Sequence, residues 1–287
     1  MKETEPKLES ERQLVDRAVA GDPIALDAVA SGLSHDLYNL AVRMVGGRTD
    51  AEDATQEILI QIITHLAQWR GDSSLRTWAW RIAVRHLMRM KRSKDEEVSS
   101  FEAIEQLIEA GSVPAALPEM SEAELTVLET ELRIACTQGM LSSLDRDMRV
   151  SWILAEVFEL EGPEAAEVLD VDAATHRKRL SRARTKLGEW MGQHCGIANP
   201  ENACRCRRQI PIALEVGAID SARLQFATHP QTSPSRLRHT TLPLIDAADE
   251  VEMAAMTICC HPDYAAPDKL VARIRDLIES GSVRMLS

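Results

Sequence analysis

Aromatic residues make up only 3% of this 287-residue chain, and it has no long apolar run. Strands are usually rich in aromatic and β-branched residues, so this scarcity, together with abundant Ala, Leu, Glu and Arg, favours helices over sheets. No stretch approaches the roughly 18 apolar residues that a membrane helix needs. The N-terminus, MKETEPKLESER, lacks the apolar core of a signal peptide. We therefore predict an all-α protein without membrane insertion, and a cytoplasmic location.

The sequence also lacks the usual signatures of catalysis. It contains no recognisable nucleophile–base pair, no glycine loop of the kind that cradles phosphates, and no paired carboxylates with metal-ligand spacing. We therefore do not expect an enzyme. Metal or thiol catalysis in the C-terminal third is the enzymatic alternative.

Charge is distributed unevenly along the chain. The net charge is −12, yet residues 70–92 contain seven basic residues and one acidic residue, and residues 173–187 contain six basic residues and no acidic one. Each segment carries +6, so the rest of the chain carries −24. This segregation predicts two basic faces on an acidic body, an arrangement that suits nucleic-acid binding. The alternative is a pair of ordinary solvated helix faces.

The spacing of apolar residues divides the chain into four parts. Helical periodicity occurs in two blocks, separated by an acidic segment that contains Gly and Pro. A Pro-, Thr-, Arg- and Cys-rich extension follows the second block. We predict two small helical domains, an acidic linker and a mostly helical or irregular extension, at residues 10–93, 121–192, 94–120 and 193–287 respectively.

Helices are harder to place in the linker and the extension. In the linker we expect at most a short helix near residues 101–108, because Gly111, Pro114 and Pro118 interrupt the apolar pattern. In the extension, helical patterns return only near residues 246–259 and 268–280.

Residues 162–187 predict a helix-turn-helix. A short first helix has Pro163 near its start, where the missing N–H is harmless, and residues 170–172 form the turn. The second helix, about 22 Å long, fits the DNA major groove, where Arg and Lys reach guanine edges and phosphates. Its inward stripe consists of His176, Leu180, Ala183 and Leu187, at helical spacing. Its opposite face presents Thr175, Arg177, Lys178, Ser181 and Arg182.

This segment resembles region 4 of extracytoplasmic-function sigma factors, through EAAEVL at residues 164–169 and THRKRLSRAR at residues 175–184. In that family the second helix reads the −35 promoter element, so the resemblance implies that the five outward residues contact DNA. His176 replaces the usual β-branched apolar residue, and Lys178 stands where a small polar residue is common. We interpret His176 as a buried packing residue, with a pH sensor as the alternative. Lys178 suggests an altered promoter preference.

A second set of motifs resembles region 2 of the same family. DAEDATQE at residues 50–57 is followed in order by WRGDSSLRTW at residues 69–78 and RIA at residues 81–83. In that family the acidic helix binds a coiled coil of the polymerase β′ subunit, and the basic helix with its preceding loop holds the unstacked −10 strand. The polymerase-binding residues that the resemblance implies are Asp53, Gln56 and Glu57. Their i, i+3, i+4 spacing makes one outward acidic patch, which suits a basic protein partner.

Holding a displaced strand requires cationic side chains and pockets or aromatic platforms for bases. The implied −10 residues are Arg70, Asp72, Ser73, Ser74, Trp80, Arg81, Arg85 and Arg89. We expect Trp78 to pack in the core and Trp80 to be partly exposed. The family often has Asn at the position of Arg85. In the family, the segment that corresponds to the acidic linker threads the nucleic-acid channels of the polymerase, where negative charge imitates RNA, but a disordered spacer has the same composition.

Five of the six cysteines lie in the last third of the chain, and cytosolic cysteines rarely form structural disulfides. His194, Cys195, Cys204 and Cys206 place four soft ligands within 13 residues, enough for a zinc site. The Cys-x-Cys spacing is shorter than the gap common in zinc sites, so a redox role and reduced packing cysteines remain as alternatives. The CCH sequence at residues 259–261 would supplement such a site.

The motifs together predict a sigma factor with a cysteine-containing C-terminal extension. Such a protein binds core RNA polymerase, recognises −35 and −10 promoter elements and starts transcription. The implied partners are the polymerase β′ coiled coil and β flap, promoter DNA, and an anti-sigma factor as a further candidate. A one-component helix-turn-helix regulator is the alternative, and it predicts dimeric DNA binding without polymerase.

Overall fold

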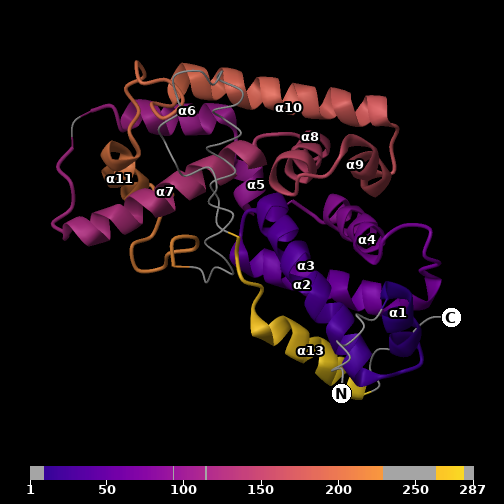
Figure 1. Cartoon of the computed structure of the whole chain (residues 1–287). Coiled ribbons are helices and arrows are strands. Elements are labelled where there is room, and N and C mark those ends of the chain that lie inside the picture. The colour runs from indigo at the N-terminus through magenta and orange to yellow at the C-terminus, as the bar shows by residue number, and fades with distance from the viewer. Residues whose placement is uncertain (1–9, 93, 114, 229–262, 281–287) are drawn as a thin grey trace, which may run out of the picture.

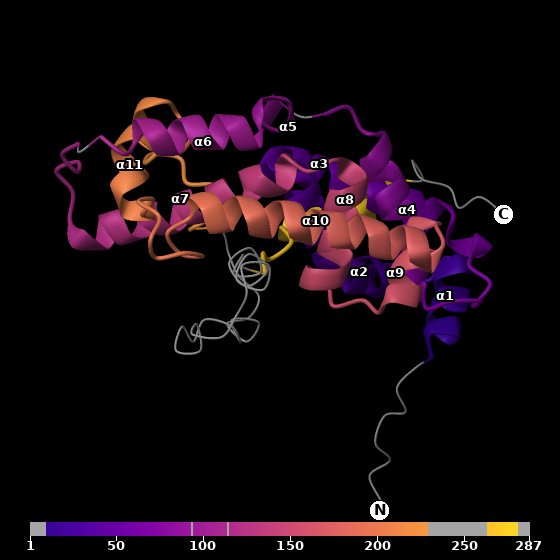
Figure 2. The ribbon, with the colours of Figure 1, turned by 90° about the horizontal axis from the view of Figure 1, so that it is seen from above.

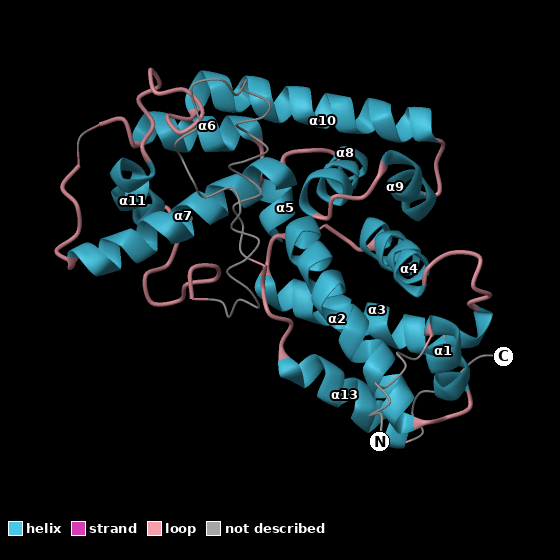
Figure 3. Cartoon of the chain, in the orientation of Figure 1, coloured by secondary structure: helices cyan, strands magenta, loops and turns pink. Residues whose placement is uncertain are grey.

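The computed structural model describes residues 10–92, 94–113, 115–228 and 263–280. These residues form helices joined by loops and contain no β-strand, which confirms the predicted all-α class (Figure 3). The helices are α1 (Glu11–Val19), α2 (Pro23–Val45), α3 (Arg48–Thr64), α4 (Leu75–Arg89), α5 (Lys94–Val98), α6 (Phe101–Ala110), α7 (Glu122–Ser142), α8 (Arg146–Trp152), α9 (Gly162–Leu169), α10 (Ala173–His194), α11 (Cys206–Glu215) and α13 (Asp268–Glu279). None of these helices is both long and apolar enough to span a bilayer.

The N-terminal helices start at side chains that satisfy the free backbone N–H groups of the first turn. Ser10 and Gln13 form a capping box at the start of α1, and the Asp22 carboxylate accepts a hydrogen bond from the Ile24 N–H (2.9 Å) at the start of α2. α2 is the central element of this half of the molecule, because it contacts α1, α3, α4, α7, α8 and α13. Its buried residues therefore organise the helices that present the candidate interfaces.

The predicted linker contains two helices, α5 and α6, and Glu96 of α5 anchors it to the second helical part. Glu96, only 2% exposed, forms ion pairs with Arg149 (2.7 Å) and with Arg146. Arg146 also donates to the carbonyl oxygens of Leu87 (3.0 Å) and Met90 (2.6 Å), around the end of α4. The interpretation of the linker as a disordered spacer is therefore wrong for this part, because its acidic side chain is buried between two arginines.

The predicted helix-turn-helix is present. α9 ends at Asp170, which adopts the left-handed conformation (φ 56°), and Asp172 caps α10 by accepting from the Thr175 N–H at 2.8 Å. α10 extends seven residues beyond the predicted end at 187. The added turns place Trp190 against Phe101 of α6, with ring centroids 5.7 Å apart. The linker thus helps to support the far end of α10.

The hydrophobic core is continuous across the predicted parts, from Val15 in α1 to Ile274 in α13. Figures 1 and 2 show α10 lying along one side of the molecule over α8 and α9, and α9 also contacts α4. α13 lies against α2 and α3 and confirms the helix expected near residues 268–280. The helix expected at residues 246–259 and the CCH sequence lie outside the described residues.

The sequence did not predict α11, whose Ile210 and Ala213 pack against α7 in a smaller second apolar cluster. The chain after α11 is held by Glu131, a buried carboxylate on α7. Its oxygens accept hydrogen bonds from the backbone N–H groups of Gln225 (2.6 Å), Phe226 (2.9 Å) and Ala227 (2.7 Å). The start of the extension is therefore part of the folded body.

Candidate functional site

The outer face of α10 is cationic and uncovered. Arg177, Lys178, Ser181 and Arg182 are exposed, and the three cations form no ion pair with any residue that the structure describes. Thr175 differs, because it is half-buried and its hydroxyl donates to the Asp172 carboxylate (2.7 Å). Four of the five predicted −35 residues are thus presented to solvent, and the fifth stabilises the start of the helix.

The inner face of α10 fixes the direction of the outer one. His176 is 1% exposed, and Ala183 and Leu187 are fully buried, so most of the predicted inward stripe is confirmed. Burial lowers the pKa of His176, and the nearby positive charges of Arg179 and Arg184 lower it further. Arg179 pairs with Asp147 (3.2 Å), and Arg184 donates to Glu156 (2.6 Å). Both arginines therefore form ion pairs within the part of the chain that the structure describes, unlike Arg177, Lys178 and Arg182.

The loop before α4 is mostly exposed at the predicted −10 residues Arg70, Asp72 and Ser74, with Ser73 half-buried. Its turn depends on Gly71, whose φ of +82° is unfavourable for other residues. The Ser74 hydroxyl accepts a hydrogen bond from the Thr77 N–H (3.0 Å) and so caps α4. These local interactions give the loop a defined shape at the start of the basic helix.

α4 lies beside α9 (Figure 1). Arg85 forms an ion pair with Asp170 at 2.9 Å, and Arg81 lies 3.9 Å from Glu167. Both contacts are open to solvent, since the Arg85 and Asp170 side chains are 51% and 66% exposed. Arg89 is exposed. In this structure, Glu167 of α9 and Asp170, the residue after α9, therefore pair with two of the three α4 cations predicted to bind the −10 strand.

The two tryptophans of α4 have the opposite placement from the one expected. Trp80 is 1% exposed and packs edge-on against Phe158, with ring centroids 4.5 Å apart. Trp78 is only partly buried. The prediction that Trp80 is partly exposed is wrong, because the segment before α9 packs on that side of α4. Trp80 therefore cannot contact DNA in this arrangement.

Trp78 instead lines an open groove between α3 and α4, with a volume of about 530 Å³. Arg85 and Arg89 line the same groove, together with His86, whose Nδ1 lies 2.9 Å from the Gln61 amide nitrogen. An indole, polar groups and two cations can accommodate an unstacked base and its phosphates. Gln61 and His86 were not predicted, although the polar residues Gln61, His65 and Gln68 recur at helical spacing.

The predicted polymerase-binding patch lies on the surface of α3. Asp53 and Glu57 are exposed, and Gln56 is partly buried. The Glu57 carboxylate lies 3.5 Å from the His86 ring of α4. The Gln56 side chain accepts a hydrogen bond from Arg273 of α13 (2.9 Å). The three residues share one face, as the spacing predicted, and α13 contacts that face at its edge.

The four predicted zinc ligands do not form a ligand group in the structure. Among the described residues, no three His, Cys, Asp or Glu side chains are arranged to hold a metal ion, and the His194 ring stacks on Trp190 (centroids 4.8 Å apart). Burial raises the pKa of Cys136 on α7, and the nearby thiols of Cys206, Cys195 and Cys204 raise it further. The structure therefore places Cys136 close to the three predicted cysteines and directs His194 elsewhere. Cys136 was not predicted, because it is at least 59 residues from the others in the sequence.

Comparison with known proteins identifies the same parts. The model of Sigma-70 region 2 matches residues 31–97. The RNA polymerase sigma-H factor of Pseudomonas aeruginosa is 32% identical over 184 residues, which cover 62% of this chain and 92% of that protein. The ECF RNA polymerase sigma-E factor of Escherichia coli K12 is 32% identical over 183 residues, with the same coverage of 62% and 92%. A solved structure of CnrH in complex with the cytosolic domain of CnrY has a TM-score of 0.44 and 21% identity, covering 64% of this chain and 97% of that one.

None of these relatives supports the alternative of a one-component regulator. The sequence identity extends over nearly the whole length of the two sigma factors, and the matching region 2 model includes the acidic helix α3 and the basic helix α4. The chain belongs to the extracytoplasmic-function group of the sigma-70 family of RNA polymerase sigma factors.

Proposed function

We propose that this protein binds core RNA polymerase, recognises −35 and −10 promoter elements and starts transcription. The observation that carries the proposal is the combination, on one body, of an exposed acidic patch on α3 and an uncovered cationic face on α10. The first suits a basic protein surface and the second suits the DNA backbone and guanine edges. Nucleotidyl transfer itself belongs to the polymerase, so the chain acts as a binding subunit in the cytoplasm.

The −35 contacts in this proposal come from α10. Arg177, Lys178, Ser181 and Arg182 approach the major groove, while Thr175 keeps the N-terminus of the helix capped and near the DNA. Since arginine can pair with the two acceptors of guanine, Arg177 and Arg182 are the best candidates for base readout. The unusual Lys178 adds a flexible cation, which suits a phosphate better than a base edge.

The −10 contacts require a change of conformation. Arg81 and Arg85 are paired with Glu167 and Asp170, so these two ion pairs must open before a DNA strand can bind both arginines. Exposed ion pairs contribute only about 0–1 kcal/mol each, so these two contacts are easily exchanged for phosphates. We propose that the two parts act as separate modules in the polymerase complex, with the groove beside Trp78 receiving part of the strand.

Binding of the free chain to DNA should be weak, because its net charge of −12 opposes approach to a polyanion. Core polymerase would hold the two basic helices at a fixed separation. Two linked weak contacts then gain from a high effective concentration. The β′ coiled coil and β flap are the polymerase surfaces we propose for α3 and for the module that contains α10, and an anti-sigma factor would compete for the same surfaces.

A charge reversal tests the role of α3. Glu57→Lys should weaken binding of the full chain to purified core polymerase, because it places a cation against the basic surface proposed as partner. Glu109→Lys, the same change at an exposed position on α6, is the control and should bind normally. Equal affinities for the two variants would remove α3 from the proposed interface.

A further inference from the structure

Tyr264 attaches the C-terminal segment, residues 263–280, to the first half of the molecule. This residue is fully buried, and both its backbone groups bond to the side chain of Asn39 on α2. The Asn39 amide donates to the Tyr264 carbonyl (2.8 Å), and its oxygen accepts from the Tyr264 N–H (2.9 Å). One residue earlier, Asp263 pairs with His35 at 3.0 Å. The start of the segment is thus fixed in place.

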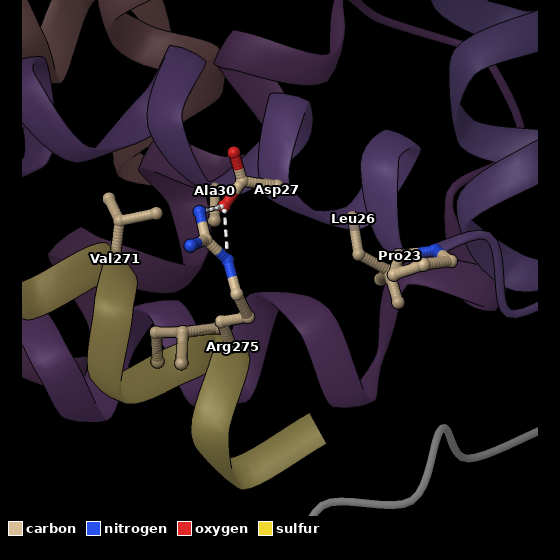
Figure 4. A pocket seen from close by; sticks show the side chains of 7 residues that line it. Pro23, Leu26, Asp27, Ala30, Val271 and Arg275 are labelled. Atoms are coloured by element: carbon tan, nitrogen blue, oxygen red, sulfur yellow. Dashed lines mark hydrogen bonds and ion pairs between the residues drawn. The ribbon is translucent and has the colours of Figure 1, made fainter. Parts of the chain in front are cut away.

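After Tyr264, α13 lies across α2 with its apolar side toward α2. Leu270 and Ile274 are 1% and 2% exposed. Figure 4 shows Arg275 reaching over to Asp27 of α2, beside Val271; the Arg275 Nε lies 3.1 Å from the carboxylate. Buried apolar side chains and an ion pair therefore fix the position of α13 on α2.

The cationic side of α13 faces α3. Lys269 forms an ion pair with Glu52, and Arg273 donates to the Gln56 side chain at 2.9 Å. Gln56 is one of the three residues proposed to bind polymerase. Glu52 immediately precedes another of them, Asp53. Two cations of the same chain, Lys269 and Arg273, therefore already occupy part of the face that would receive a basic partner.

These contacts are suited to exchange. Lys269 and Arg275 are more than half exposed, so solvent screens their ion pairs, and each is individually weak. The bonds between Tyr264 and Asn39 are buried, so they would keep α13 close to α3 after Lys269 and Arg273 leave it. The local concentration of α13 would stay high. A tethered helix of this kind competes with a partner from solution without any need for a strong interaction.

We propose that α13 is an internal competitor of core polymerase: Lys269 and Arg273 cover the Glu52–Gln56 edge of α3 and must leave it when the polymerase docks. The inference rests on the proposed function of the α3 patch. The structure thereby assigns the C-terminal extension a role in setting how readily the chain enters the polymerase complex.

Two matched variants of the full chain test the competition. Lys269→Ala/Arg273→Ala should bind purified core polymerase about two- to fivefold more tightly than wild type, as expected from the loss of weak exposed contacts. Arg208→Ala/Arg223→Ala removes the same charge from exposed positions of the extension that lie outside α13. An equal gain in both variants would overturn the proposal, because net charge alone would then account for it.

Hydrogen exchange of the wild-type chain gives a second readout. Amides of α13 should exchange faster in the polymerase complex than in the free chain, while those around Tyr264 should keep their protection. If α13 stays protected in a complex that does form, the internal competitor is excluded and the proposed function stands. If the chain forms no complex with core polymerase, the proposed function fails and the inference fails with it.

Discussion

The helices α4 and α10 have nearly the same charge in the sequence but different surroundings in the fold. Each belongs to a segment that carries +6. The outer cations of α10 face solvent, whereas Arg81 and Arg85 of α4 lie against Glu167 of α9 and Asp170, the residue after α9. A run of basic residues thus predicts a nucleic-acid-binding helix, but only the tertiary packing decides whether its face is exposed.

The largest effect on stability is expected at Glu96, the linker residue that pairs with Arg146 and Arg149. Glu96→Ala leaves Arg149, which is 1% exposed, without its carboxylate partner. Removing one partner of a buried ion pair typically costs 3–5 kcal/mol, so the free energy of unfolding should fall by about 3 kcal/mol. Chemical denaturation measures it. Glu97→Ala, at the exposed neighbouring position, should change stability little; equal losses would mean that the buried network does not hold the two halves together.

The next largest effect distinguishes the exposed, unpaired cations of α10 from those that form ion pairs with described residues. Arg177→Ala should weaken promoter binding by the polymerase complex by about 1–3 kcal/mol if this arginine reads a base. Arg179→Ala is the control on the same helix, since Arg179 already forms an ion pair with Asp147. Binding to a promoter fragment at fixed salt gives both affinities. An Arg177→Ala variant with an unchanged promoter profile would remove this residue from the DNA contacts.

A smaller effect concerns the buried side of α10. Because the folded state lowers the pKa of His176 below its usual 6.5, the unfolded chain binds more protons at acidic pH. The stability that His176 contributes is therefore present above about pH 6.5 and declines as pH falls below it. His176→Leu should reduce this dependence, measured as the free energy of unfolding between pH 7.5 and 5.5. An unchanged dependence would mean that His176 is not held neutral by burial.

The smallest effect tests whether α9 covers α4. Asp170→Asn removes the ion pair with Arg85 and keeps a residue that tolerates the left-handed conformation. Exposed pairs contribute about 0.2–1 kcal/mol, so binding of a single-stranded −10 oligonucleotide should strengthen up to about fivefold. Asp147→Asn breaks a comparable pair with Arg179 and should leave oligonucleotide binding unchanged. Equal behaviour of the two variants would indicate that α9 does not restrict access to Arg85.

Patterns with a local cause could be predicted from the sequence. The helix-turn-helix follows from helical spacing and from the Asp172 cap, and the burial of His176 follows from its place in the apolar stripe. The shared face of Asp53, Gln56 and Glu57 follows from their spacing on one helix. Whether these residues bind polymerase remains a prediction.

Features that depend on contacts between distant segments could not be predicted. Trp80 is buried because Phe158, 78 residues later, packs on it. The local spacing of apolar residues does not predict that contact. Glu96 belongs to an acidic segment that resembles a spacer until Arg146 and Arg149 are placed beside it. The helix α11 contains Pro211, which weakens a helical signal, and it is stabilised by packing on α7.

Run-off transcription with purified core polymerase on genomic DNA fragments tests the central claim most directly. We predict discrete transcripts that require both the full chain and core polymerase, and that decrease for Arg177→Ala. If the chain neither associates with core polymerase nor yields any transcript that core polymerase alone does not, the proposed role in initiation is contradicted.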